Sequence, residues 1–176
     1  MIRNKKLVIL EVAGALFIIF FGASLHFTFE ASGYNPVVGA VSAVNESVWE
    51  HLKLPFWSSI FWLLITMYPL RKTVSNFFSA KAAGLVVMLV IIPVVFYSYT
   101  AFTKGILAVD IGSFVAAAII GQTLSLSLYK KAAKSRITEA LAVAVLVLLV
   151  IMFIVFTFYP PHLQPFLDTA TGQYGI

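Results

Sequence analysis

The sequence predicts an all-α protein, a polytopic membrane helix bundle of about five transmembrane helices. Three observations predict this class: 61% of the 176 residues are hydrophobic, 11% are charged, and the apolar residues fall into long runs. A soluble domain carries about a quarter charged residues, and one of this size leaves roughly 30% of its surface exposed. The composition therefore excludes a soluble globular enzyme, a disordered chain and, since cysteine is absent, a disulfide scaffold.

Five apolar runs are long enough to cross a hydrocarbon core, which takes about 20 residues of helix. They cover residues 7–29, 54–70, 82–102, 106–129 and 138–159. As helices they satisfy their own backbone polar groups, as lipid requires. With an outer loop at 30–53 and an outer tail at 160–176, they fill the chain, so we expect residues 1–176 to form a single membrane domain. The second run is short, and we expect a helix starting near Asn45 to extend it.

Basic residues gather on one side of these spans. Ten of the 12 Lys and Arg residues lie there: Arg3, Lys5, Lys6, Arg71, Lys72, Lys81, Lys130, Lys131, Lys134 and Arg136. By the positive-inside rule the N-terminus lies in the cytoplasm and the C-terminus outside. Because these charges are scattered between apolar spans and form no continuous face, we expect no nucleic-acid partner. The expected partner is membrane lipid.

Histidines and acidic residues collect at the opposite, outer end. All 3 histidines and five of the 7 acidic residues map there: His26, Glu30, Glu46, Glu50, His51, Asp110, His162 and Asp168. The positive-inside rule does not require this bias, because acidic residues contribute little to it. Ionisable residues within membrane segments are costly and usually functional. The pattern therefore predicts a shared polar site on the extracytoplasmic side.

The residue types and spacings at this end favour a metal site. His26 and Glu30 are four residues apart and share a helix face, as do Glu46 and Glu50. Imidazole and carboxylate suit zinc, iron or manganese, and three protein ligands with an open position are typical of catalytic zinc. We expect a divalent metal, zinc first, whose ligands are drawn from His26, Glu30, Glu50, His51, His162 and Asp168. The expected general base is Glu46 or Asp110.

Some of these residues also have a structural interpretation. Glu46 follows Asn45, a good N-cap, and can complement a helix dipole. Glu50 and Lys53 are three residues apart and can form a surface ion pair. Glu11, in the inner half of the first span, is expected to reach the interface or to pair with Lys131 or Arg136.

Asp110 heads a stripe of small residues at helical spacing. The stripe continues through Ser113, Ala117, Gly121 and Ser125. Small residues allow helices to approach closely, so we expect this face to point into the bundle and Asp110 to lie near the outer polar cluster. The alternative for Asp110 is a hydrogen bond to a neighbouring helix.

The outer tail is expected to fold back over the helix ends. Tyr159-Pro160-Pro161 ends the last span, because proline cannot continue a helix and restricts the residue before it. Phe166 and Leu167 give the tail apolar side chains to bury. Folding back brings His162 or Asp168 to the cluster, whereas the alternative is a tail lying flat on the membrane interface.

Several segments resemble a known family. They are His26-Phe-Thr-Phe-Glu30, Val44-Asn-Glu-Ser-Val-Trp-Glu-His-Leu-Lys-Leu54, Phe156-Thr-Phe-Tyr-Pro-Pro-His162 and the tail from Asp168 to Ile176. These segments resemble a family of small, mostly Gram-positive bacterial integral membrane proteins classed as a domain of unknown function. The resemblance implies a bacterial plasma membrane protein and implies no activity.

Two classes of function fit the outer site. The first is a metal-dependent membrane hydrolase or transferase whose substrate is a lipid or a lipid-linked group. The second is a transport protein or the solute-binding subunit of a transporter, and an accessory or sensor protein is a third option. A polar path to the cytoplasm favours transport, and a closed outer site favours the enzyme or the sensor.

Overall fold

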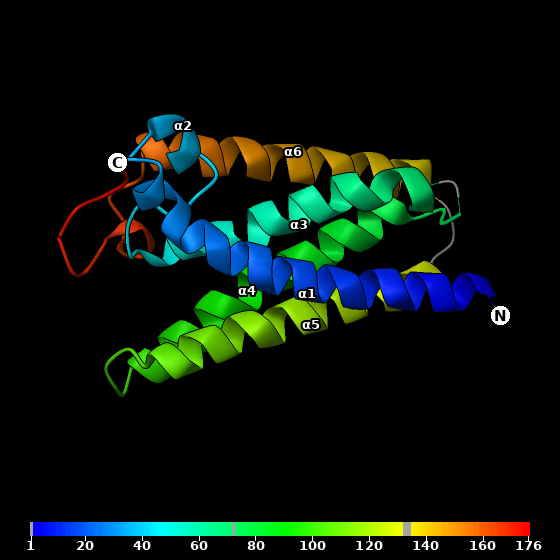
Figure 1. The fold of residues 1–176 in the computed structure, drawn as a ribbon, viewed down its shortest axis with the longest axis horizontal. Coiled ribbons are helices and arrows are strands. Elements are labelled where there is room, and N and C mark those ends of the chain that lie inside the picture. Colours follow the sequence, from blue (N-terminus) through cyan, green and yellow to red (C-terminus); the bar gives the residue numbers. More distant parts are fainter. Residues whose placement is uncertain (1, 72, 132–134) are drawn as a thin grey trace.

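A computed structural model describes residues 2–71, 73–131 and 135–176, and this part of the chain is all-α with no strand (Figure 1). The prediction of an all-α fold is confirmed. The helices are α1 (Ile2–Ala31), α2 (Pro36–Gly39), α3 (Val48–Leu70), α4 (Phe77–Thr100), α5 (Leu107–Lys131) and α6 (Arg136–Phe158), followed by the 3-10 turn η1 (Gln164–Phe166). The two ends of the chain lie at opposite ends of the bundle, and α2, η1 and the tail gather at the end that carries the C-terminus (Figure 1).

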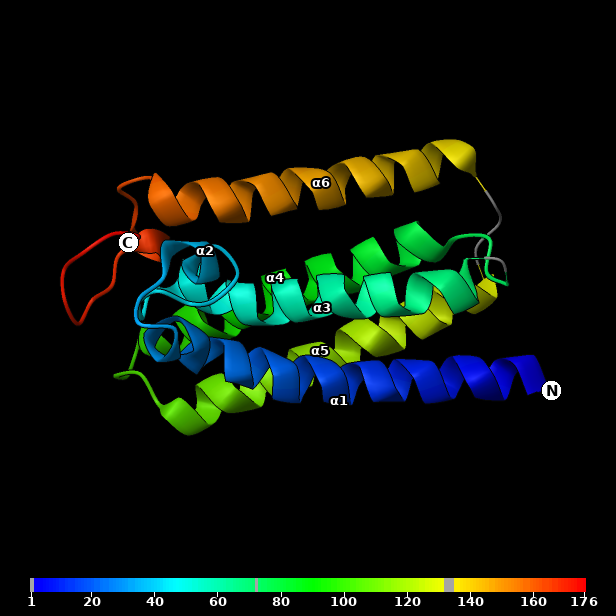
Figure 2. The same cartoon turned by 45° about the horizontal axis from the view of Figure 1, so that its top comes forward.

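Four helices in the described residues are long and apolar enough to cross a membrane. They are Lys5–Ala31, Phe77–Thr100, Leu107–Lys130 and Arg136–Phe158. The expected second span, residues 54–70, is not among them, so an arrangement of five spans stays a prediction. It lies in α3, which runs between α1 and α6 (Figure 2) and whose residues 52–58 are all buried. This buried N-terminal half carries Lys53 and Ser58, which a lipid-facing segment would not tolerate, whereas Leu64, Ile65 and Tyr68 toward the other end are exposed.

The orientation across a membrane rests on the charge pattern alone and stays a prediction. Lys72 and Lys134, two of the ten basic residues on the expected cytoplasmic side, lie outside the described residues. The helix ends that precede and follow those loops lie at the N-terminal end of the bundle, opposite to α2 and the tail (Figure 1).

Small residues set the crossing of α4 and α5, as the stripe on α5 predicts. Ser113, Ala117, Gly121 and Ser125 are buried. A Cβ atom at Gly84 of α4 would lie 2.5 Å from the carbonyl oxygen of Gly121, so only glycine permits this approach. Ser125 Oγ donates to the Ala80 carbonyl at 3.0 Å. The stripe is thus a helix-packing face.

An apolar cluster fills the middle of the bundle. It comprises Ile18 of α1, Met88 of α4 and Ala117 and Ala118 of α5, all buried. Along α1, Ile18 lies about 12 Å from His26 on one side and about 10 Å from Glu11 on the other, at 1.5 Å per residue. Along α1, this cluster thus lies between His26 and Glu11.

The tail turns back onto the helix ends, as predicted. The Ile176 amide donates to the Thr157 carbonyl at 3.2 Å. Phe166 is buried, and its ring lies against Trp49 of α3, with centroids 4.7 Å apart. Burial of this ring offsets part of the conformational entropy that the tail loses when it is ordered.

Candidate metal-binding site

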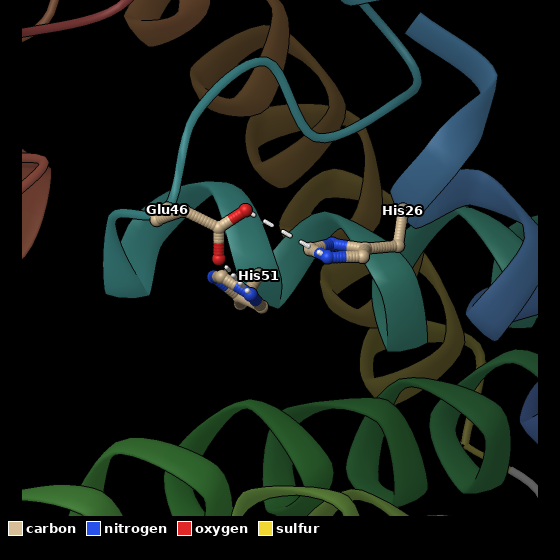
Figure 3. A group of neighbouring side chains, drawn as sticks. All are labelled: His26, Glu46 and His51. Atoms are coloured by element: carbon tan, nitrogen blue, oxygen red, sulfur yellow. Dashed lines mark ion pairs between the residues drawn. The ribbon is translucent and has the colours of Figure 1, made fainter. Parts of the chain in front are cut away.

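One group of three side chains in the described residues is arranged to hold a metal ion: His26, Glu46 and His51. His26 comes from the outer end of α1, Glu46 from the loop before α3, and His51 from the start of α3. One ligand atom from each lies within 4.8 Å of the others. Figure 3 shows the Glu46 carboxylate between the two imidazole rings. We call this group the outer triad.

The distances in the outer triad suit a shared cation better than direct hydrogen bonds. Glu46 Oε1 lies 3.7 Å from His26 Nε2, and Glu46 Oε2 lies 3.4 Å from His51 Nε2. Hydrogen bonds between such atoms span about 2.7–3.2 Å. Ligand atoms placed 2.0–2.1 Å from a tetrahedral zinc lie roughly 3.3–3.4 Å apart. Two of the three ligand pairs therefore lie near the spacing that a bound ion requires, through different oxygens of Glu46, within a group whose ligand atoms lie up to 4.8 Å apart.

The tautomer of His51 strengthens this interpretation. His51 Nδ1 lies 2.9 Å from the Ser47 carbonyl oxygen, which can only accept, so Nδ1 carries the proton. In the neutral ring, Nε2 then presents a lone pair toward the Glu46 carboxylate. Two acceptors facing each other are unfavourable unless a proton or a metal ion lies between them. A backbone carbonyl that fixes the tautomer is also typical of metal-ligating histidine.

Solvent can reach the outer triad. The side chains of His26, His51 and Glu46 are 28%, 36% and 61% exposed. Phe27, which is exposed, packs its ring edge-on to His26. His26 Nδ1 departs from the usual pattern of metal ligands, because it is buried and has no hydrogen-bond partner among the described residues.

The loop before α3 is shaped by local hydrogen bonds. The Asn45 side chain accepts from the Ser47 amide at 2.9 Å, and Ser47 Oγ caps α3 by accepting from the Glu50 amide at 3.3 Å. Ser47-Val-Trp-Glu50 matches the S-x-x-E start of a helix. Glu46 therefore precedes the helix, and Glu50 lies in its first turn. The S-x-x-E pattern therefore distinguishes the positions of the two glutamates. Their spacing of four residues alone does not.

Glu50 is paired with a buried lysine instead of joining the outer triad. Glu50 Oε2 lies 2.6 Å from Lys53 Nζ, and both side chains are buried. Lys53 also donates to the carbonyls of Gly39 and Ser42, and Glu50 accepts from the Val44 amide. The two residues do pair, but the idea of a surface pair is wrong, because the loop at 39–44 closes over them. Glu50 as a metal ligand stays a prediction without a nearby histidine partner.

The family of the chain follows from a match along its whole length. The model of a family of unknown function, DUF6512, matches residues 1–176. The chain belongs to this family. No curated protein and no solved structure matches the chain, so the function of this DUF6512 member must be argued from its site. The bacterial, Gram-positive source stays a prediction.

Two further predicted ligands of this DUF6512 chain lie at its surface. Glu30, near the end of α1, and His162, in the tail, are both exposed. The His162 ring stacks on Tyr174, with centroids 4.6 Å apart. Neither residue belongs to the outer triad, and their roles as metal ligands stay predictions.

Asp168 is buried in a turn of the tail. Its carboxylate accepts from the Ala170 amide at 2.9 Å and from the Thr171 hydroxyl at 2.7 Å. Burial alone raises the pKa of a carboxyl group, but the bonds from Thr171 and from backbone amides, that of Glu46 included, outweigh it and lower the pKa of Asp168. Asp168 therefore touches the backbone of an outer-triad residue without joining the triad as a ligand.

Asp110 forms a hydrogen bond to the neighbouring helix α4, which is the structural alternative given above. It accepts a hydrogen bond from the Tyr99 hydroxyl at 2.7 Å, and that hydroxyl accepts from the Ile106 amide. These bonds fix the turn between α4 and α5. Asp110 as a general base stays a prediction.

A second ionic cluster lies toward the other end of the bundle. Lys81 Nζ donates to both carboxylate oxygens of Glu11 at 2.8 Å and to Gln122 Oε1 at 3.2 Å. Both charged side chains are buried. We call these three residues the inner cluster. Lys81, which α4 brings to the buried face of α1, is the partner of Glu11 in place of the expected Arg136, and the side chain of the other expected partner, Lys131, lies outside the described residues.

Proposed function

We propose that this DUF6512 member is an integral membrane protein that binds a divalent transition-metal ion through His26, Glu46 and His51. The observation that carries the proposal is the convergence of three ligand atoms within 4.8 Å from three separate segments. Two imidazoles and one carboxylate are a known ligand set of catalytic zinc with an open position. Zinc is therefore the first choice.

We infer that the bound ion serves hydrolysis or group transfer on a lipid or a lipid-linked substrate. A zinc ion with an open position lowers the pKa of bound water to about 7. The exposed ring of Phe27 beside His26 offers apolar surface for an acyl or isoprenoid chain. The polar group of that substrate then lies beside the outer triad.

Transport is the second candidate, and the apolar cluster in the middle of the bundle argues against it. Ile18, Met88 and Ala117 lie between the outer triad and the inner cluster. The side chains of this cluster are apolar, although the Ser59 hydroxyl lies 3.6 Å from Met88 Sδ. A closed outer site favours the enzyme, with a metal sensor as the remaining alternative.

Metal analysis of the purified protein tests the proposal. We expect about one zinc ion per chain in the wild type and in the control His162→Ala, since His162 lies outside the outer triad. His51→Ala and Glu46→Gln should weaken zinc binding by more than about 100-fold, because loss of an outer-shell partner alone costs 10–100-fold. Equal binding by wild type and His51→Ala, or no binding by either, would overturn it.

Activity assays on zinc-loaded protein separate the candidate functions. Release of a water-soluble product from a lipid extract, lost on adding a chelator, supports the enzyme. Zinc entering proteoliposomes that hold a fluorescent zinc indicator supports transport. Zinc binding without product release or zinc transport supports a metal sensor.

A further inference from the structure

The C-terminal tail reaches the loop that carries Glu46, although the two are far apart in the sequence. Asn45 Nδ2 donates to the Gly175 carbonyl at 3.0 Å, across 130 residues. We propose that the tail, through Gly175 and Asn45, positions Glu46 and His51 for metal binding. This inference rests on the proposed function, since it concerns the same metal site.

A short chain of hydrogen bonds links the tail to the outer triad. The same Asn45 side chain that donates to Gly175 accepts from the Ser47 amide at 2.9 Å. The Ser47 carbonyl, in turn, lies 2.9 Å from His51 Nδ1 and fixes the orientation of that ring. A shift of Asn45 is therefore transmitted to the imidazole through one residue.

Glu46 depends on its backbone for its position. Its side chain is 61% exposed and meets only the two histidines, at 3.4 and 3.7 Å, among the described contacts. Asn45 precedes Glu46, and the backbone amide of Glu46 faces the Asp168 carboxylate of the tail. The tail thus contacts the loop at two neighbouring points, the Asn45 side chain and the Glu46 amide. Ligands need outer-shell partners of this kind to stay in place.

The tail is itself firmly held. Gly175 has a φ of 62°, in the left-handed region that favours glycine. A Cβ atom there would lie 2.6 Å from the Thr157 carbonyl oxygen and 3.0 Å from Pro160 Cγ. The next residue, Ile176, bonds to the same Thr157 carbonyl. A side chain at position 175 must therefore displace the carbonyl that Asn45 uses.

Two variants break the link from opposite sides without touching the outer triad. Asn45→Ser keeps a hydroxyl that can accept from the Ser47 amide, but the shorter side chain cannot reach Gly175. Gly175→Ala displaces the tail carbonyl. Gly33→Ala is the matched control, because Gly33 has a similar φ of 71° and open space around its Cβ position. It carries the same backbone strain far from the tail.

Zinc affinity and the visible spectrum of the cobalt-substituted protein provide the readouts. We expect both variants to lose about 10–100-fold in zinc affinity and to shift the cobalt absorption bands, since the ligand geometry changes. The double variant should lose no more zinc affinity than the weaker-binding single variant, because the two substitutions break the same hydrogen bond between Asn45 and Gly175. Gly33→Ala should match the wild type in affinity and spectrum.

Backbone amide exchange of residues 44–51 in metal-free protein gives a second, metal-independent measurement. Faster exchange in Asn45→Ser with unchanged zinc affinity and cobalt spectrum means that the tail only orders the loop, and the inference fails. Unchanged exchange and affinity in both variants also refute it. If the wild type binds no zinc, the proposed function itself fails. If the wild type binds zinc and the two variants bind it equally well, only this inference fails.

Discussion

The outer triad and the inner cluster both draw on α1, but they satisfy their charges in different ways. In the inner cluster, Lys81 lies 2.8 Å from both oxygens of Glu11, so a buried cation and a buried anion neutralise each other. In the outer triad, a carboxylate faces two imidazole nitrogens at 3.4 and 3.7 Å. No cationic side chain among the described contacts lies between them.

This difference separates a structural ion pair from a binding site. A buried carboxylate that already has its own ammonium partner has little left to offer a ligand. The partly exposed triad has unused acceptor capacity and access to solvent. The Glu50–Lys53 pair, next to the outer triad in the sequence, is likewise buried and ion-paired, although Glu50 Oε1 has no hydrogen-bond partner among the described residues.

The largest expected effect comes from breaking the inner cluster. Lys81→Met leaves Glu11 buried without its partner and should lower the free energy of unfolding by about 3–5 kcal/mol. Combining it with Glu11→Leu should recover most of that loss, because no charge then stays buried. Unfolding in mixed micelles measures both, with the exposed Lys104→Met as control. A loss under about 1 kcal/mol for Lys81→Met would contradict a buried pair.

The second prediction concerns zinc as a stabiliser of the outer triad. At a free zinc concentration of 100 times Kd, binding should add about 2.7 kcal/mol to the free energy of unfolding. Lys81→Met should gain the same amount, because the two clusters lie about 22 Å apart along α1 and distant sites behave additively. Thermal unfolding with and without zinc checks this. A gain that survives in the double variant His26→Ala/His51→Ala would point to a different site.

The third prediction uses acid to release the tail from the outer end. Because the pKa of folded Asp168 lies below its ordinary value, the carboxylate adds stability above about pH 4. That contribution is lost as the pH falls through the lowered pKa. Amide protection factors across residues 164–176, corrected for the intrinsic exchange rate at each pH, should therefore fall at acid pH in the wild type. Asp168→Asn should show little of this dependence, and an identical acid response in that variant would refute the assignment.

The smallest effect is expected from Glu46→Gln on stability. Its carboxylate is mostly exposed and its two ionic contacts are long, so the free energy of unfolding should change by about 0.5 kcal/mol or less. The same variant should lose zinc binding. A large loss of stability would make Glu46 a structural residue like Glu11 and would remove the contrast between the two clusters.

The sequence predicted the long helices well, because apolar runs mark where they lie and Pro160 follows the end of α6, although Pro55, Pro69 and Pro93 lie inside helices. The helix containing the second run begins at Val48 after the Ser47 cap, close to the expected start near Asn45. The sequence predicts His26, Glu46 and His51 at the outer site, with Glu46 or Asp110 as the general base. The burial of the Glu50–Lys53 ion pair could not be predicted from the spacing of the two residues. It depends on the loop that brings the Gly39 and Ser42 carbonyls over α3 to accept from Lys53.

The bond between Asn45 and Gly175 also bears on the order in which the molecule assembles. It closes a loop of 130 residues that encloses α3, α4, α5 and α6, and contacts so distant in sequence form late because of the entropy of closing the loop. The ligands of the outer triad all precede α4 in the sequence and leave the ribosome before α4, α5 and α6. Their final geometry must wait until the last helix is in place and the tail has docked, so premature metal capture by a half-made chain is disfavoured.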